Sequence, residues 1–572
     1  MSASLLAATR PLYDKTAQVV ESGSQPVNRM HSDIVDHLNR AYARYCGLLT
    51  MAEEQADAGN YPAAAALAQI AARYTFAGYV GLFGSHRLER LLLELGRQIP
   101  AAPPHAAQRQ NGNRRHILHV LSYGRPVGGD ARCAWRWIQE DSNSRHSVVI
   151  TTQADVNGIY ELPEVLKESA EKSGGFLRTL SAPTTNHLEQ ARELRKLCQE
   201  ADIVVLHLFP YDIVPVLALA AGCDSVKTIF VNHADHAFWV GAGVSHVIAH
   251  LRKQPPQFSE KRRGLNPERC AVLPIPLVPA PPSVTREEAK RALGYAPDSV
   301  VLLTIASPFK YSSPGRVGFL DLVAPVMAQF PKAVLIAVGP EAKDAWQAAS
   351  VQTQGRIVPL GTRWDTNLFY AAADIYLDSV PFSSTTSLLE AGSHGTPLLG
   401  YQLPEAELAL LGPGAPGFEE TIQLAGNVEA YRALLSRLIT DAELRSQVGQ
   451  RTRSGILSLH TGRKWVDAAH ELYAKAEQTN GRGCMPGNGD AFEASALNVA
   501  LFQLYGRVQT RQMIGKYIGA LPYRSRLPIT WRLYQKGFDL CFLNLLPPPV
   551  DDITRRFGRW LKRKADRRLR LR

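Results

Sequence analysis

The feature that most constrains the fold is an alternation of short β-branched runs with helical stretches, which occurs in two series along the chain. The first series has strand candidates at 116–122, 147–152, 203–209, 227–233 and 270–277. The second has them at 300–307, 333–340, 356–361, 374–379 and 397–401. Buried strands that alternate with helices are typical of a parallel sheet covered on both faces. The sequence therefore predicts an α/β protein with two Rossmann-like domains in tandem.

Proline- and glycine-containing breaks divide the chain into four segments. We predict a helical N-terminal region at 1–110, a first Rossmann-like domain at 111–282, a second at 283–478 and a helical, basic C-terminal extension at 479–572. The N-terminal region has Ala- and Leu-rich helical spacing with a turn at Gly81 and Gly84. It is either a cap that buries apolar surface or a small domain for contact with an acceptor or a subunit.

The composition excludes several classes of protein. Hydrophobic residues make up 45% and charged residues 20%, as in globular proteins. The chain has no apolar run long enough for a membrane span and no basic, apolar leader, so we expect a cytoplasmic location. The seven cysteines are scattered singly, which argues against a disulfide or zinc framework. No GxGxxG or Walker sequence supports a dehydrogenase or a P-loop ATPase.

The positive charge is concentrated at the C-terminus. Of the net charge of +12, residues 551–572 contribute +7, from ten Lys or Arg and three Asp. A helix there would set Ile553, Phe557, Trp560 and Leu561 against the basic residues. This pattern predicts peripheral attachment to an anionic membrane surface, on its inner face, with a solvated tail as the alternative. We do not expect nucleic acid as a partner, because no reading module is present.

The stretch 374–401 predicts an anion site. It reads as a short strand, a hydroxyl-rich turn and a helix that begins near Thr386. Unpaired N–H groups at a helix N-terminus attract phosphate, so Thr385, Thr386 and Ser387 should reach a diphosphate through hydroxyl and N–H groups. Capping of the helix is the alternative role of these residues. Glu390, about one turn further on, could accept hydrogen bonds from a ribose diol.

These residues resemble the donor-binding motif of nucleotide-sugar glycosyltransferases with the GT-B fold, especially glycosyltransferase family 4. The motif stands here as Ser387, Glu390-Ala391 and Gly395-Thr396-Pro397. Many members place a second Glu eight positions before the ribose Glu, where this chain has Phe382. The resemblance runs from about 116 to 475. It implies two Rossmann-like domains that face each other across a cleft, the second holding the nucleotide and the first the acceptor.

The resemblance also implies the donor-binding residues. Lys310, after the strand at 300–307, would bind diphosphate oxygens. The family usually has an Arg shortly before this Lys, where this chain has Ser307 and Pro308, and Arg316 could substitute from the other side. A solvated surface position is the alternative for both cations. After the strand at 356–361, Gly361, Thr362 and Arg363 would hold the base, largely through backbone groups, while Asp365 would cap the next helix. Gly128 and Gly129 are a pair that lets sugar or phosphate approach the backbone, and a plain tight turn is their alternative role. We expect their loop to be followed by a helix N-capped by Asp130.

The resemblance places catalytic residues in the first domain as well. His233 matches a histidine that faces the transferred sugar, where it could orient a hydroxyl or pass charge. A structural role is the alternative for this histidine. Asp235 and His236 are close enough in sequence for either to be the working group instead. Lys310 would stabilise the leaving diphosphate.

A metal site is the alternative for the histidines. His246 and His250 are four residues apart, a spacing that zinc sites use on a helix, and they could join His233, Asp235 and His236. The segment 243–253 also reads as an ordinary amphipathic helix. We expect no metal and no cofactor, because Lys310 and the helix N-terminus take the role of a cation.

Together these features predict a glycosyltransferase that moves a sugar from a nucleoside diphosphate donor to a glycan, lipid-linked or protein acceptor. A nucleotide-sugar epimerase of the same fold and a non-catalytic membrane scaffold are the alternatives.

Overall fold

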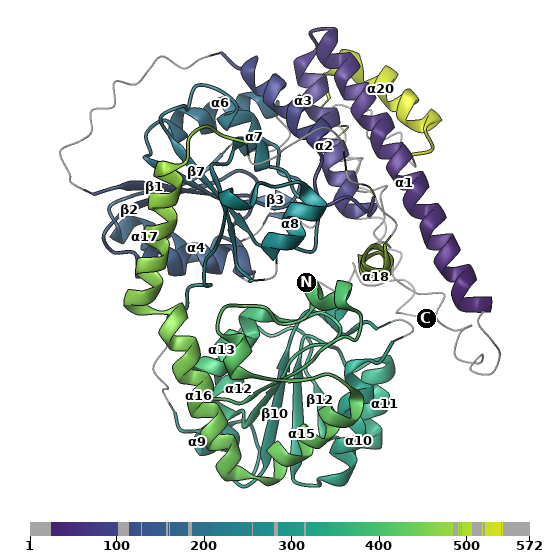
Figure 1. The fold of residues 1–572 in the computed structure, drawn as a ribbon, viewed down its shortest axis with the longest axis vertical. Coiled ribbons are helices and arrows are strands. Elements are labelled where there is room, and N and C mark those ends of the chain that lie inside the picture. Colours follow the sequence, from purple (N-terminus) through teal and green to yellow (C-terminus); the bar gives the residue numbers. More distant parts are fainter. Residues whose placement is uncertain are drawn as a thin grey trace, which may run out of the picture.

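The computed structural model shows two α/β lobes flanked by helices (Figure 1). It describes residues 25–100, 114–126, 128–155, 158–159, 161–180, 186–253, 255–279, 284–313, 316–483, 490, 492, 495–505, 518, 521–538 and 540. The basic segment 551–572 lies outside the described residues. The membrane contact expected of it therefore stays a prediction.

The first lobe contains a seven-stranded sheet in which all neighbouring strands are parallel. In sheet order the strands are β5 (Leu177–Thr179), β2 (Arg145–Ile150), β1 (His116–Leu121), β6 (Ile203–His207), β7 (Lys227–Asn232), β8 (Val247–His250) and β9 (Cys270–Val272). Its helices include α4 (Gly129–Glu140), α5 (Glu164–Lys172), α6 (His187–Cys198), α7 (Val214–Leu219) and α8 (Pro255–Arg263). The order reverses between β1 and β6, where ligands bind in such sheets.

One predicted helix of this lobe is wrong. The segment 243–253 forms strand β8 between β7 and β9, and all four residues of that strand are buried. A central position in the sheet favours its Val-Ile pair over the helical spacing. Across four residues of a strand, His246 and His250 are about 13 Å apart, rather than on adjacent turns of a helix.

The second lobe repeats the architecture. Its six parallel strands are, in sheet order, β12 (Ile357–Pro359), β11 (Ala333–Val338), β10 (Val300–Ile305), β13 (Ile375–Leu377), β14 (Leu398–Tyr401) and β15 (Ile422–Ala425). Its helices include α9 (Arg286–Ala292), α10 (Phe319–Gln329), α11 (Asp344–Gln352), α12 (Asn367–Ala372), α13 (Thr385–Ser393) and α15 (Val428–Thr440). The predicted pair of Rossmann-like units is thus confirmed.

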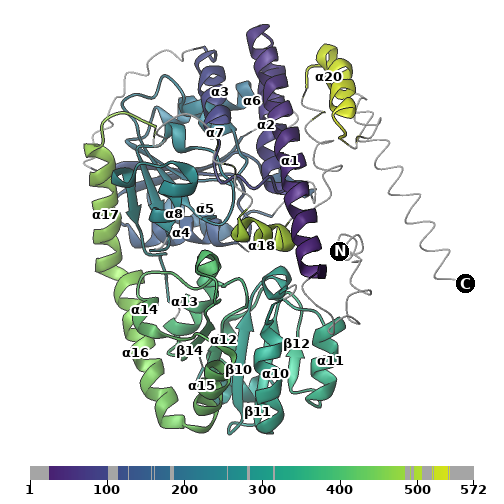
Figure 2. The same cartoon turned by 45° about the vertical axis from the view of Figure 1, so that its right-hand side comes forward.

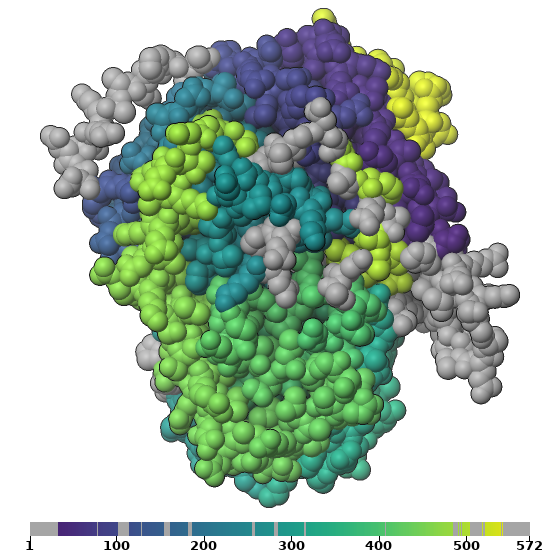
Figure 3. Space-filling model, viewed as in Figure 1, coloured from purple at the N-terminus to yellow at the C-terminus, as the bar shows by residue number. Residues whose placement is uncertain are grey.

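Two consecutive helices connect the lobes. α16 (Ala442–His460) packs on the second lobe, and α17 (Gly462–Gln478) returns to the first, as Figures 1 and 3 show. Trp465 of α17 is fully buried in a core that holds residues of both sheets. The indole N–H of Trp137, on α4, donates to the Tyr473 hydroxyl of α17 at 2.5 Å. The returning helix therefore belongs to the core of the first lobe.

The flanking helices also pack on the lobes. α2 (Tyr61–Ala77) and α3 (His86–Arg97) share one apolar core with α6, α7 and the first sheet. α1 (Gln25–Asp57) and α18 (Ala496–Tyr505) contribute Ile34, Leu38 and Leu501 to the core of the second lobe, and α18 lies beside α1 (Figure 2). A last described helix, α20 (Tyr523–Gln535), packs through Leu533. None of the helices in the described ranges is long and apolar enough to cross a membrane.

Candidate functional site

The loops at the carboxyl ends of β1 and β13 meet between the lobes. A Cβ added to Gly129, at the start of α4, would lie 3.6 Å from the Thr386 hydroxyl of α13. Gly128 has a φ of +155°, and a Cβ there would lie 2.6 Å from a carboxylate oxygen of Asp130. The structure therefore brings the predicted glycine pair against the predicted phosphate site. Asp130 is in the first turn of α4 instead of at its N-cap, which is Gly128.

A buried carboxylate shapes the turn before α13. Asp378 accepts the backbone N–H groups of Ser379 and Ser384, each at 2.9 Å. Ser384 is the N-cap of α13, and its hydroxyl donates to the Ser387 hydroxyl at 3.2 Å. No side chain caps α13 within the described residues, and the Thr386 hydroxyl in its first turn lies close to Gly129. Sequence reasoning placed this helix correctly but missed the part that Asp378 plays.

Lys310 lies beside this turn, in a 3₁₀ helix (Pro308–Tyr311) after β10. Its ammonium group donates to the Ser383 carbonyl at 2.8 Å and lies 4.8 Å from the centre of the Phe382 ring. Burial lowers the pKa of Lys310 to about 8, against the opposing charge of Asp378. The ammonium group of Lys310 is therefore held beside the phosphate turn by the main chain of that turn.

The position of the missing second Glu is filled by an apolar ring. Phe382 is buried, and its ring packs edge-on against His236 of the first lobe, with the ring centres 4.7 Å apart. His236 thus reaches the second lobe at Phe382, beside Lys310.

Asp235 is engaged in ion pairs. Its carboxylate oxygens lie 3.3 Å from Nε of Arg252 and 3.4 Å from Nδ1 of His236. Burial alone would raise the pKa of Asp235, but the charges of Arg252 and His236 outweigh it and hold the pKa at about 2. A carboxylate that is this weakly basic suits a structural ion pair better than a general base.

His233 follows β7 and is half-buried. Its Nε2 lies 3.0 Å from Nδ1 of His207. Burial lowers the pKa of His233 to about 4, and Asp130 is the charge that opposes this effect. The side chain therefore faces the glycine loop on one side and a second imidazole on the other.

The predicted metal alternative is not formed by the expected histidines. Nδ1 of His246 accepts the N–H of Thr228, and Nδ1 of His250 lies 3.1 Å from the Asn232 amide nitrogen. The donor atoms of Cys133, His207 and His233 do lie within 4.8 Å of one another. However, the two imidazoles direct nitrogens at each other, and burial raises the pKa of the Cys133 thiol to about 12. The arrangement favours a hydrogen-bonded imidazole pair beside a neutral thiol.

The predicted ribose ligand is paired with arginines of the opposite lobe. Glu390, on α13, forms an ion pair with Arg136 of α4 and lies 3.6 Å from Arg132. Nη1 of Arg136 is buried without a hydrogen-bond partner among the described residues. The two arginines are four residues apart and so lie on one face of α4. Their spacing is visible in the sequence, but their partner is not.

The remaining predicted donor residues lie further out. Arg316 has its guanidinium 3.4 Å from the Glu405 carboxylate, and is not the second cation beside Lys310 that the sequence suggested. Gly361, Thr362 and Arg363 follow the edge strand β12, with Thr362 and Arg363 exposed and the neighbouring Trp364 70% exposed. Since β12 is three strands from β13, about 14 Å separates this loop from the phosphate turn. The N-cap of α12 is Thr366, and no side-chain capping bond to this helix is present within the described residues. The predicted capping by Asp365 is therefore wrong.

A pocket of about 640 Å³ lies elsewhere, at the opposite end of the first sheet. Its lining includes Arg90, Arg97, Lys227 and Arg482. None of the residues predicted to bind the donor lines it.

No protein-family model matches the chain, and no curated protein matches it. Among solved structures it is similar to HepE of Anabaena in complex with UDP and glucose, at 15% identity and a TM-score of 0.46 over 63% of this chain and all of that chain. A glycosyltransferase from Rickettsia africae has 13% identity and a TM-score of 0.46 over 64% of this chain and all of that chain. A mutant O-GlcNAc transferase from Thermobaculum terrenum has 15% identity and a TM-score of 0.44 over 78% of this chain and 84% of that chain.

The chain has the GT-B fold. This follows from its own topology: two parallel sheets in the Rossmann strand order, facing loops at their carboxyl ends and a helix that returns to the first lobe.

Proposed function

We propose that this protein is a glycosyltransferase that moves a sugar from a nucleoside diphosphate donor to a hydroxyl of a glycan, lipid-linked or protein acceptor. The observation that supports this most is the meeting of Lys310, the N-terminus of α13 and the Gly128–Gly129 loop between two facing lobes. N–H groups and one ammonium can hold a diphosphate and stabilise the charge that it gains on leaving.

The donor is proposed to lie along the carboxyl edge of the second sheet, with its diphosphate at Thr385, Thr386 and Ser387. The base would reach the loop at 361–363, and the ribose would meet Glu390 and compete there with Arg136 for the carboxylate. We propose that no metal takes part, so a chelator should leave transfer unchanged.

The test is a panel of UDP-, GDP- and dTDP-sugars. A donor that binds raises the melting temperature by mass action, and its turnover releases nucleotide. Lys310→Ala should abolish both effects. The matched control is Lys332→Ala, because this exposed lysine pairs with Asp298 away from the cleft. A protein that changes the sugar without an acceptor would be an epimerase. A protein that binds no donor and releases no nucleotide would be a scaffold.

A further inference from the structure

Four histidines stand in a diagonal row across the first sheet. They are His146 in β2, His119 in β1, His207 at the end of β6 and His233 just after β7. The pairing registers offset each histidine by two residues from the next along the strands. An offset of two residues keeps the side chains on one face of the sheet. The row therefore runs on one face toward the carboxyl end of the sheet, where the loop at Gly129 approaches the second lobe.

The rings are joined nitrogen to nitrogen. Nδ1 of His146 lies 3.0 Å from Nε2 of His119, and Nδ1 of His119 lies 3.1 Å from Nε2 of His207. The last link, from His207 to His233, is 3.0 Å. His146, His119 and His207 are fully buried, and the Trp137 ring of α4 lies edge-on to the latter two. Water is thus kept from the inner part of the row.

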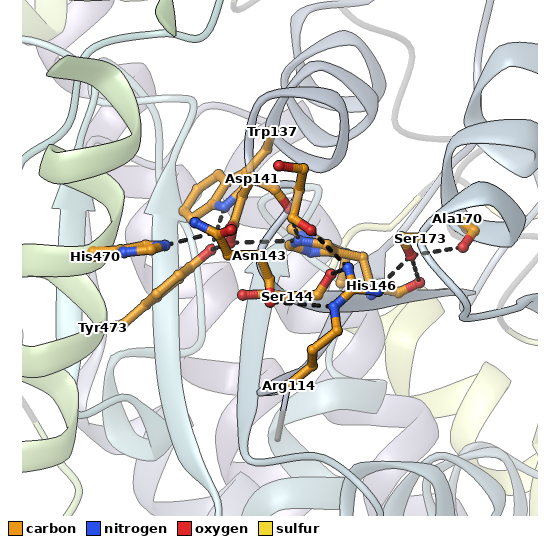
Figure 4. A network of polar contacts seen from close by, with 12 residues as sticks. Arg114, Trp137, Asp141, Asn143, Ser144, His146, Ala170, Ser173, His470 and Tyr473 are labelled. Carbon is orange, nitrogen blue, oxygen red and sulfur yellow. Dashed lines mark hydrogen bonds and ion pairs between the residues drawn. The ribbon is translucent and has the colours of Figure 1, made fainter. Parts of the chain in front are cut away.

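The inner end of the row is anchored by Asp141 (Figure 4). Nε2 of His146 lies 3.0 Å from the main-chain oxygen of Asp141 and 3.4 Å from a carboxylate oxygen. The same carboxylate accepts a hydrogen bond from the Tyr473 hydroxyl at 3.0 Å and lies 3.4 Å from Nε2 of His470. Burial would raise the pKa of Asp141, but His146, Ser144 and Tyr473 hold it well below its usual range. Asp141 is therefore a buried anion.

This anchor sets the tautomer of every ring. Both oxygens of Asp141 near His146 only accept, so Nε2 of His146 must carry a proton. If His146 is neutral, its Nδ1 is an acceptor, and the neighbouring Nε2 must donate to it. The same step repeats at His119 and at His207. His233 is then left with its proton on Nε2 and a lone pair on Nδ1.

The row can also hold one extra proton without any ring turning. A proton that arrives at Nδ1 of His233 releases the Nε2 proton to His207, and each ring repeats the exchange. The extra proton ends on His146, whose two nitrogens are then both protonated beside the Asp141 carboxylate. Burial keeps the pKa of His119 and of His207 well below the usual range, so neither is a resting place for the charge.

We propose that this row is a proton relay, in which His233 takes the proton of the acceptor hydroxyl and His146, paired with Asp141, stores it. The inference rests on the proposed function. The acceptor oxygen bonds to the anomeric carbon as the bond from that carbon to the diphosphate breaks, and the electron pair leaves on the diphosphate. Such a single displacement inverts the anomeric centre. After the products leave, the reverse transfers return the proton to water in the cleft.

The relay explains how His233 could act as a general base although it is weakly basic. His233 alone is a weak base, because burial lowers its pKa to about 4. A carboxylate behind an imidazole is the usual remedy, since it holds the ring and stabilises the cation. Here three imidazoles stand between the base and that carboxylate. We assign His207, His119, His146 and Asp141 as positioning and proton-storing residues.

The first test is histidine ¹⁵N NMR on the full-length protein without donor, with resonances assigned through single His→Gln variants. Other groups that titrate or carry charge lie near the row. They are Asp130 and Cys133 beside His233, His116 beside His146, and His470 and Tyr473 beside Asp141.

In this NMR titration we expect all four rings to be Nε2–H tautomers at high pH. On acidification His146 should become the imidazolium while His233 changes to the Nδ1–H tautomer. An imidazolium at His233 with His146 unchanged would overturn the relay.

The second test breaks the row in its middle. His119→Gln keeps a group that can donate and accept hydrogen bonds but cannot pass a proton. We expect kcat to fall about 10²-fold or more, the usual contribution of a general base, with donor KM and donor-induced stabilisation unchanged. The matched control is His116→Gln, in the same strand, whose ring bonds to the Glu200 carbonyl and the Ser147 hydroxyl outside the row. If His119→Gln does not fold, Asp141→Asn replaces it, because the main-chain oxygen of residue 141 still anchors His146.

The outcomes separate the two proposals. Transfer at a normal rate by a folded His119→Gln or Asp141→Asn protein would refute the relay and leave the glycosyltransferase proposal standing, as would a product with retained configuration. Absence of transfer by the natural protein with every donor would refute the proposed function. The NMR titration, which needs no donor, would then decide on the relay alone.

Discussion

Lys310 is the residue on which donor binding is expected to depend most, and its protonation gives a prediction. Because burial lowers its pKa to about 8, the ammonium is present at pH 7 and is lost as the pH rises above 8. A diphosphate interacts with the charged form alone. We therefore expect the affinity for the nucleoside diphosphate of the best donor to be about thirtyfold weaker at pH 9.5 than at pH 7, by isothermal titration calorimetry.

Lys310→Arg is the control, because arginine stays protonated over this range. The variant should lose the pH dependence, even if its affinity differs. An identical loss of affinity in both proteins would show that another group titrates.

The pair of Glu390 and Arg136 gives a prediction on stability. Both side chains are nearly buried, with 16% and 11% exposed. Removing one partner of such a pair leaves an uncompensated charge, at a cost of about 3–5 kcal/mol. Glu390→Ala should therefore lower the melting temperature, and the double variant with Arg136→Leu should recover part of the loss. A double variant less stable than either single one would contradict this, and differential scanning fluorimetry is sufficient to see it.

At the scale of elements, the loop between β1 and α4 should control access to α13. Gly129 is within van der Waals reach of Thr386, so a branched side chain would fill the space proposed for the diphosphate. We expect Gly129→Val to weaken donor binding at least tenfold, measured by thermal shift, while the protein stays folded. The control is Gly426→Val, since nothing lies within 4 Å of a Cβ added there. Unchanged binding by Gly129→Val would place the diphosphate elsewhere.

The strands and the phosphate turn could be predicted because their signals are local. β13 and α13 begin within a residue of where their pattern of apolar and hydroxyl residues put them. β8 was mistaken for a helix because a short buried run has no decisive period, and only its place between β7 and β9 resolves it. The partner of Arg136 depends on how two lobes meet, which no local pattern records.

The histidine row lies between these cases. Three apolar strands each contain a histidine of the row: His119 in β1, His146 in β2 and His207 in β6. This is unusual in the sequence, because a buried polar side chain needs a hydrogen-bond partner. Which ring would bond to which depended on the strand order and the register, and these come from the tertiary structure. The histidines in the first three strands are thus a signal that the sequence analysis did not use, and their partners follow only from the strand order and register.

For the whole molecule, the question is whether the N-terminal helices form a separable domain or part of the catalytic body. Leu67 and Ile70 of α2 and Leu88, Leu91, Leu92 and Leu95 of α3 are at most 2% exposed, in one core with α6, α7 and the first sheet. The guanidinium of Arg195, on α6, donates to the carbonyls of Gly96 and Ile99. Both observations favour a cap over a detachable domain.

Deletion of residues 1–100 tests this directly. The deletion removes these six side chains and exposes the apolar surface of α6, α7 and the first sheet that they cover. Burial of one such side chain contributes about 1.5–3 kcal/mol, so the lost contacts amount to about as much as the whole stability of a typical domain. We expect the fragment 101–572 to aggregate or to lack a cooperative melting transition. A monomeric 101–572 fragment that kept its melting temperature and bound the donor would show instead that the helices are an independent module, free to serve an acceptor or a second subunit.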